Sequence, residues 1–302
     1  MTDQTQDQVA PAPGAPKSSE QPDRQGFAKI LYNVGLLRES WAAIIGISIV
    51  LFWVIVALFA PVLAPYDPNE SDFTAAMQGP SALHWLGTDD SGRDILSRII
   101  FGAQRILSVA PIAMIVAYAV GIALGVLSGY FGGWVDSIVS FVVNIILSFP
   151  LIILFIVLLS AFGPSAVNVV VAVTAAASPA IARIVRGLVL DIRGLEYVSA
   201  AQIRGETSFY IMLVELLPNA RGPIIVDACL RMGYTIIAIG VLGFLGLGLP
   251  PPDPDWGSMV SQARAMITVF PHMAIFPSIA ISSLVIGFNL LADGLREISL
   301  RD

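Results

Sequence analysis

Six long apolar stretches constrain this chain more than any other feature of its sequence. A helix that crosses the hydrocarbon core of a bilayer needs about 20 mostly apolar residues, because about 30 Å must be covered at about 1.5 Å per residue. The segments that meet this requirement are 41–60, 106–127, 137–160, 165–182, 222–249 and 273–292. The sequence therefore predicts an all-α, polytopic membrane protein with six transmembrane helices.

The composition agrees with a membrane protein and excludes several other classes. Only 13% of the residues are charged and 56% are hydrophobic, whereas an ordinary soluble domain has about a quarter of its residues charged. A net charge of -6 and a pI near 4.9 give no basic surface for nucleic acid. The single cysteine, Cys229, cannot form an internal disulfide, and we interpret it as a packing residue.

The first 40 residues differ from the rest of the chain. They are polar and rich in Pro, Gln and Ser, so they cannot bury enough apolar area to offset the entropy lost on ordering. We expect residues 1–40 to be a disordered cytoplasmic tail and residues 41–302 to form one six-span domain. Because the first apolar run begins only at Trp41, a cleavable secretory signal is not expected.

Lysine and arginine in the connections predict the orientation, because these residues resist translocation. With a cytoplasmic tail, the inner segments carry Lys17, Arg24, Lys29, Arg38, Arg183, Arg186, Arg193, Arg204, Arg221, Arg296 and Arg301. The outer segments then carry only Arg93, Arg98, Arg105 and Arg264. Both termini are therefore expected in the cytoplasm.

The segment 197–219, "YVSAAQIRGETSFYIMLVELLPN", lies between the fourth and fifth spans and is expected to face the cytoplasm. Residues 196–204 predict a short helix that brings Tyr197, Ala200, Ala201 and Arg204 near one another. Gly205 would end it, and a second helix over 209–217 would stop before Pro218. Two readings fit this spacing: an interfacial helix pair on lipid headgroups, or a knob that fits a partner's groove.

The pattern of residues 199–219 resembles the EAA loop of ABC-importer permeases. Ala200, Ala201, Gly205, Leu217 and Pro218 match the family's pattern at the required spacing. Ser199 stands where the family has Glu, and Glu215 stands where it has Ile. The resemblance implies that the matched residues, together with Tyr197 and Asn219 at the ends of the segment, couple the chain to an ATPase.

Two further segments narrow the resemblance. "LGTDDSGRDILSRIIFGAQRIL" (86–107) and "GFLGLGLPPPDPDWGSM" (243–259) are similar to segments of the dipeptide, oligopeptide and nickel permeases, particularly the C-type subunit. The resemblance implies a multi-pass permease of the bacterial cytoplasmic (inner) membrane. It also implies a homologous B-type permease, two cytoplasmic ATPases that bind ATP and Mg²⁺, and a solute-binding protein as partners. Peptide and nickel transport are not separated by these segments.

The chain itself is not expected to hydrolyse ATP or to carry a cofactor. A P-loop requires a lysine that contacts the phosphates, and the only lysines are Lys17 and Lys29, in or beside the tail. His84 and His272 are the only histidines and lack metal-binding spacing. Ser160 and Ser178 have no base nearby in the sequence, so we do not expect an enzyme or a metal site.

An ion-coupled secondary transporter is the competing class, and it would place titratable groups within its spans. The clearest such pair is Asp227 and Arg231, four residues apart in the fifth span. At this spacing the two side chains can neutralise each other, which favours a structural pair over a proton relay.

Polar and helix-breaking residues within the spans are the candidates for the translocation path. The amides of Asn144 and Asn289 are costly to expose to lipid, so we expect them to face the bundle interior. Pro150 should bend the third span, and Pro179 should kink the fourth.

The outer connections carry three further expectations. The segment 94–107 should lie along the membrane interface with Arg98 in water, and Thr88 and Asp89 are the expected helix N-caps. The run "PPPDPDWG" should end the fifth span, with Trp256 anchored at the headgroups.

Overall fold

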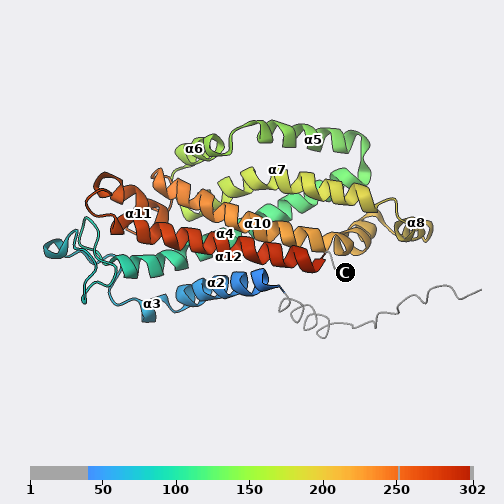
Figure 1. The fold of residues 1–302 in the computed structure, drawn as a ribbon. Coiled ribbons are helices and arrows are strands. Elements are labelled where there is room, and N and C mark those ends of the chain that lie inside the picture. Colours follow the sequence, from blue (N-terminus) through green and yellow to red (C-terminus); the bar gives the residue numbers. More distant parts are fainter. Residues whose placement is uncertain (1–39, 251, 300–302) are drawn as a thin grey trace, which may run out of the picture.

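The computed structural model describes residues 40–250 and 252–299, and these ranges hold helices and loops without a β-strand. Of the predicted disordered tail only Ser40 is described, and it caps the first described helix. The long helices lie side by side in an elongated bundle (Figure 1). The longer helices in chain order are α2 (Trp41–Leu58), α4 (Ile95–Phe131), α5 (Gly133–Ser148), α6 (Leu151–Phe162), α7 (Ala166–Ile192), α10 (Leu217–Phe244) and α12 (His272–Ser299). The shorter elements are α3 (Ala60–Leu63), η2 (Phe73–Ala75), α8 (Glu196–Ile203), α9 (Ser208–Tyr210), η3 (Ile211–Leu216), α11 (Trp256–Ala263) and η4 (Arg264–Met266).

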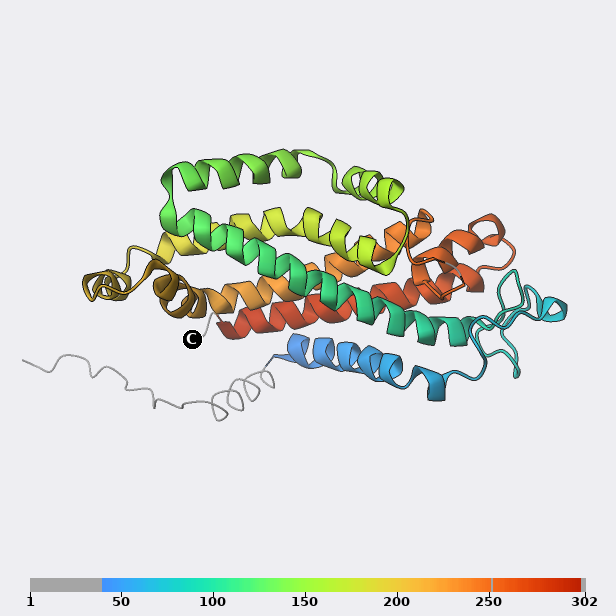
Figure 2. The same ribbon diagram turned by 180° about the vertical axis from the view of Figure 1, so that it is seen from behind.

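The prediction of an all-α membrane protein is confirmed, with one change to the spans. Within the described residues, five helical runs are long and apolar enough to cross a membrane, and α5 with α6 would make a sixth. These two helices are bent by 90° relative to each other. The break lies at Phe149 and Pro150, so the bend predicted at Pro150 is confirmed and the third span is a broken pair (Figure 2).

Three predicted boundaries of the fourth and fifth spans are wrong. The fourth span continues past residue 182 to Ile192 and runs unbroken through Pro179. The fifth is continuous with the segment before it, from Ser208, and ends at Phe244 rather than at 249. Hydropathy alone does not detect these extensions, because the added helical turns carry polar residues.

Close packing of α4 against α7 depends on three glycines at four-residue intervals, Gly121, Gly125 and Gly129. A Cβ atom on Gly121 would lie 2.9 Å from the Ser178 carbonyl oxygen, and one on Gly125 would lie 2.6 Å from the Ala182 carbonyl oxygen. Small residues at this spacing let membrane helices approach closely. The contacts advance in the same direction along both helices, so α4 and α7 run parallel.

A second glycine-lined contact joins α2 to α12. Gly46 of α2 meets the backbone of Leu291, and Gly287 of α12 meets Ile49, where a Cβ would lie 2.9 Å from Cγ2. Here the residue numbers run in opposite directions, so the two helices are antiparallel. Gly46 meets backbone atoms of α12, whereas Gly287 meets the side chain of Ile49. A side chain at Gly46 would therefore push the two helices apart.

The segment 94–107 does not lie along the membrane interface, because it is the first part of α4. The helix is capped by Asp94, whose carboxylate accepts a hydrogen bond from the Ser97 amide at 2.8 Å. The predicted caps, Thr88 and Asp89, are instead buried in the preceding loop. The Asp89 carboxylate accepts hydrogen bonds from backbone amides of that loop.

Arg98 is buried, contrary to the prediction that it faces water. Its side chain is 2% exposed and donates a hydrogen bond to the Pro68 carbonyl at 3.0 Å. The Asp89 carboxylate lies 3.6 Å from Arg98 Nε. The loop between α3 and α4 therefore folds over the arginine and supplies the partners that water would otherwise provide.

Trp256, at the start of α11, is a core residue and not a headgroup anchor. It is 1% exposed, and its indole N–H donates to the Ile99 carbonyl of α4 at 3.0 Å. Its ring packs edge-to-face on Trp53 of α2 with centroids 4.9 Å apart. Gly102 leaves the space that the indole fills. This one side chain therefore joins α11 to α2 and α4.

Asp255 holds the start of α11 as its N-cap. Its Oδ1 accepts a hydrogen bond from the Gly257 amide at 3.0 Å. Its Oδ2 lies against Gly243 and Gly248, and it has no hydrogen-bond partner in the described part of the chain. Burial raises the pKa of this carboxyl to about 6.

We predict that Gly125→Ala destabilises the protein, whereas Gly187→Ala does not. Both glycines are helical, and alanine favours a helix by about 1 kcal/mol over glycine. A Cβ at Gly187 meets no atom within 4 Å, but one at Gly125 meets the α7 backbone, where overpacking costs about 1–3 kcal/mol. Thermal unfolding in detergent measures the difference, and equal melting temperatures for the two variants would contradict the close contact.

We also predict a pH-dependent stability that originates in Asp255. The pKa of Asp255 in the folded protein, about 6, exceeds the ordinary value of 3.8. The contribution of the protonated carboxyl to the free energy of unfolding is therefore fully present below about pH 4 and is lost as the pH rises through 6. Asp255→Asn should therefore gain stability relative to the unaltered protein between pH 4 and pH 7.5, by at most about 3 kcal/mol. Melting temperatures over this range test it; a constant difference would show that Asp255 does not titrate as described.

Candidate functional site

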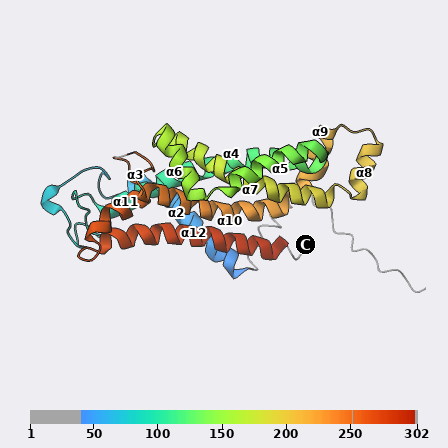
Figure 3. The same cartoon turned by 90° about the horizontal axis from the view of Figure 1, so that it is seen from above.

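The segment predicted to be the coupling element forms one end of the molecule. Figure 1 shows α8 projecting beyond the bundle where α7 ends and α10 begins. The C-terminal end of α12 lies at the same end, which we call the α8 end. The loop before α4 and the helix α11 lie at the opposite end, the α11 end. Figure 3 shows the same separation from above.

The first predicted helix is confirmed as α8, and its two faces differ. Val198 and Ala201 are fully buried, whereas Ala200 is exposed. Ile203, at the end of the helix, is 87% exposed. Tyr197 is half-buried, and its hydroxyl has no hydrogen-bond partner among the described residues. One face of α8 therefore packs against the rest of the chain, and the other face is accessible.

Gly205 makes the turn between the two helices possible. Its φ is +78°, a conformation that side-chain-bearing residues rarely adopt. A Cβ at this position would meet no atom within 4 Å. The need for glycine is therefore conformational and not a matter of space. The next helix, α9, begins three residues later at Ser208 and is capped by Thr207, whose hydroxyl accepts a hydrogen bond from the Tyr210 amide at 3.2 Å.

The sequence predicts that the second helix stops before Pro218, but the helix continues through this residue. Residues 208–244 form one continuous helical run. The π-helical segment η3 lies directly before Leu217 and Pro218. Proline lacks an amide donor and clashes with the preceding turn of an α-helix. Wider π turns are rare, and where they occur they are mostly single turns inside α-helices. The second half of the predicted coupling segment is therefore continuous with a long helix that could cross a membrane.

A separate hydrophobic cluster holds the segment onto the bundle. It contains Val198 and Ala201 of α8 together with Ile211 and Leu216 of η3, packed on α4 and α7. Polar contacts add to it: Arg204 Nη2 lies 3.4 Å from Glu215 Oε1, and the Asn219 amide donates to the Glu215 carbonyl at 2.6 Å. Leu217 is half-buried, while Pro218 and Asn219 are exposed. The predicted residues thus gather in one place, but only some of them are accessible.

The pore candidates lie in different surroundings. Asn289 of α12 is half-buried against α10, where a Cβ on Gly233 would lie 3.1 Å from its Oδ1. Asn144 of α5 and Pro150 are exposed on this chain. Asn144 Oδ1 accepts a hydrogen bond from Arg183 of α7 at 2.9 Å.

The contact between α5 and α7 contains charged residues that the sequence reasoning did not place there. Arg186 donates to both carboxylate oxygens of Asp136, at 2.5 and 2.6 Å. Arg193 donates to the Gly129 carbonyl at 2.8 Å. Arg183 and Arg186 were assigned to the connection after the fourth span, but both lie within α7. The helical periodicity continues beyond the apolar stretch, and this sequence signal could have placed both arginines within the helix.

The ion pair predicted within the fifth span is present. Arg231 Nε lies 2.7 Å from Asp227 Oδ2. The same oxygen accepts a hydrogen bond from the Tyr118 hydroxyl of α4 at 2.6 Å. This arrangement satisfies the carboxylate with two donors and joins α10 to α4, as a structural pair does.

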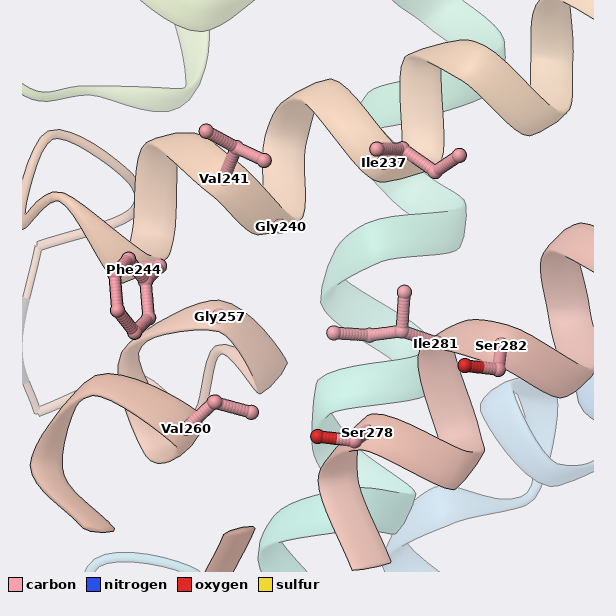
Figure 4. Close-up of a pocket in the computed structure, with 9 residues that line it drawn as sticks. All are labelled: Ile237, Gly240, Val241, Phe244, Gly257, Val260, Ser278, Ile281 and Ser282. Atoms are coloured by element: carbon pink, nitrogen blue, oxygen red, sulfur yellow. The ribbon is translucent and has the colours of Figure 1, made fainter. Parts of the chain in front are cut away.

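Toward the α11 end, the helices α10, α11 and α12 surround a cavity of about 270 Å³ (Figure 4). It is lined by Ile237, Gly240, Val241, Phe244, Gly257, Val260, Ser278, Ile281 and Ser282. Apolar groups dominate, and the two serine hydroxyls come from one face of α12. Among residues 40–250 and 252–299, no group of three His, Cys, Asp or Glu side chains could hold a metal ion.

Comparison with known proteins identifies the family. The family model described as binding-protein-dependent transport system inner membrane component matches residues 121–302. The chain belongs to this family. A second model, described as the N-terminal transmembrane domain of oligopeptide transport permease C, matches residues 36–80. The chain is thus a transport component of an ABC importer, and a multi-pass membrane protein.

Individual members of the family are similar over most of this permease. The dipeptide transport system permease protein DppC of Alkalihalophilus pseudofirmus is 37% identical over 294 residues, covering 96% of this chain and 94% of that protein. The glutathione transport system permease protein GsiD of Shigella flexneri is 41% identical over 261 residues, covering 86% of each. A solved structure of the MetNI methionine ABC transporter in inward facing conformations has a TM-score of 0.56 and 22% identity, covering 68% of this chain and 95% of that one. That structure supports the fold alone.

We predict that Gly205→Val loosens the segment 197–217 of this permease, and that Gly205→Asn does so less. A left-handed conformation costs most residues about 1–2 kcal/mol, but asparagine tolerates it better. Hydrogen exchange over residues 206–212 should become about tenfold faster in Gly205→Val, as expected for about 1.4 kcal/mol. Gly194→Ala is the matched control, because that glycine has open space and no left-handed backbone. Unchanged exchange in Gly205→Val would contradict the conformational role.

Proposed function

We propose that this permease is the C-type transmembrane subunit of an ATP-driven importer for dipeptides and oligopeptides. In this assembly it forms the translocation path together with a homologous B-type permease. Two separate cytoplasmic ATPases bind ATP and Mg²⁺, and a solute-binding protein delivers the peptide. The similarity to a dipeptide permease and to a permease for glutathione, itself a short peptide, supports this substrate class.

One observation carries the coupling role: an exposed, glycine-jointed helix is anchored to the bundle by one face only. Ile203 on α8 is 87% exposed, and a large exposed apolar side chain of this kind is typical of an interaction site. The exposed Ala200 lies beside it, one turn earlier. The α8 end is the face we assign to the cytoplasm, together with both chain termini, and the groove of an ATPase is the partner we assign to α8.

The continuity of the segment with α10 suggests how a movement of the ATPases would reach the path. A push on α8 acts through the hydrophobic cluster on η3, and residues 208–244 form one helical run. The same run reaches the cavity between α10, α11 and α12. Rocking of this helix would therefore change the far end of the bundle, as inward- and outward-open states require.

Reconstitution of the complete complex tests the proposal. Liposomes that contain both permeases, the ATPases and the binding protein should take up a labelled dipeptide only with ATP. Ile203→Glu, which places a charge in the ATPase contact, should reduce uptake at least tenfold and release the ATPases during purification. Its melting temperature should stay unchanged, because Ile203 makes no core contact.

Leu83→Glu is the matched control, because Leu83 is 74% exposed at the α11 end. That variant should retain the ATPases. Uptake of nickel and not of peptide would favour a nickel importer. Ion-driven uptake by the chain alone, or full ATPase binding by Ile203→Glu, would contradict the coupling role.

A further inference from the structure

The break between α5 and α6 requires protein cover or a water-filled cavity beside it, and this chain alone does not supply the cover. A broken helix at membrane depth leaves backbone groups without helical partners, and such breaks occur only where they are buried in protein or line a water-filled cavity. On this chain, Phe149 is 55% exposed and Leu151 is 51% exposed. The neighbouring Ser148 and Pro150 are exposed too. The break therefore faces a space outside the chain's own core.

A line of polar residues leads along α5 to this break. Asp136, Ser140, Asn144 and Ser148 follow one another at four-residue intervals, which places them along one side of the helix. Asp136 and Asn144 contact arginines of α7, and Ser140 donates to Asp136 at 3.1 Å. Exposure increases along the line, from the half-buried Asp136 to the exposed Asn144. Such a polar line is not expected on a helix that faces only lipid.

Arg183 stands beside this line and differs from Arg186 of α7 and from Arg193, which caps the end of α7. Arg186 has the carboxylate of Asp136, and Arg193 has a carbonyl at the end of α4. In the part of the chain that the structure describes, Arg183 is exposed, its hydrogen bond goes to the amide oxygen of Asn144 at 2.9 Å, and no carboxylate forms an ion pair with it. It lies nine residues before the end of α7, which is about 14 Å along the helix. An arginine inside a helix that is long and apolar enough to cross a membrane, without an opposite charge beside it among the described residues, indicates a function.

The two side chains together present hydrogen-bond donors. A guanidinium has five N–H donors in a planar fork, and one of them is used by Asn144. Asn144 accepts through its oxygen, which leaves its NH₂ group with two donors. A carboxylate, with two oxygens in one plane, fits such a fork in a bidentate manner.

We propose that Arg183 and Asn144 form a carboxylate-binding site on the translocation path, which receives the C-terminal carboxylate of the transported peptide. This inference rests on the proposed peptide-import function. Two other anions have the same chemistry as the peptide carboxylate and are the alternative ligands: a lipid phosphate and a carboxylate side chain of the second permease. The peptide is favoured because the polar line and the exposed break continue from the site, and a lipid-facing surface would not tolerate either feature. The neutral Asn144 amide leaves the arginine with its full positive charge, which is then available to the peptide carboxylate.

Transport by the complete reconstituted complex tests this site with two peptides, one with a free C-terminal carboxylate and one with a C-terminal amide. Each is presented on saturated binding protein, so that differences arise in the permease. Arg183→Gln should lower the turnover of the free acid at least tenfold and that of the amide less than twofold. Arg183→Lys, which keeps the charge but loses the fork, should restore part of the rate. Arg264→Gln, an exposed arginine at the α11 end, should leave the acid-to-amide ratio unchanged.

Several results would overturn the site. An equal loss for both peptides, or no loss in Arg183→Gln, would show that the carboxylate is not recognised there. Loss of the second permease from the purified variant would assign Arg183 to a partner carboxylate. Loss of a bound phospholipid, seen by native mass spectrometry with an unchanged ratio, would assign it to lipid phosphate. Failure of the unaltered complex to transport either peptide would instead reject peptide import itself, and the ligand with it.

Discussion

The backbone contact between α4 and α7 supports most of the features described above. Gly121, Gly125 and Gly129 bring the two helices within backbone distance, and a membrane gives little hydrophobic force to hold helices apart or together, so close packing decides their position. This contact aligns the last turns of α4 with those of α7. The hydrophobic cluster under α8 is built on these turns, and Asp136 comes within reach of Arg186.

The two ends of the bundle are built by different means. At the α11 end, the indole of Trp256 holds the short helix α11 against α4 and α2. The buried Asp255 caps α11, and the buried Arg98 holds the loop before α4. At the α8 end, apolar packing holds one face of α8 and leaves the other accessible. The helical run 208–244 joins these ends. A rigid connection between an accessible element and a distant cavity is the arrangement that mechanical coupling requires.

The sequence predicted the helix and the glycine turn of the segment 197–205 because their signals are local. A short amphipathic helix, a glycine and a second helix are encoded by neighbours in the chain, and Gly205 adopts the left-handed backbone that glycine permits. The same local rules failed at Pro218, where the π-helical segment η3 accommodates the proline within a continuous helix. They also failed to place Arg183 within a helix. The apolar stretch ends before this residue, but α7 continues past it.

By itself, the sequence determined the membrane class, the number of apolar stretches and the helix–glycine–helix order of the coupling segment, because hydropathy and residue spacing are properties of consecutive residues. Only the tertiary structure decided which polar residues are buried. Arg98 was expected in water and Trp256 at the headgroups, yet their partners, the Pro68 and Ile99 carbonyls, come from distant parts of the chain. Burial depends on such long-range contacts, and no local pattern encodes them.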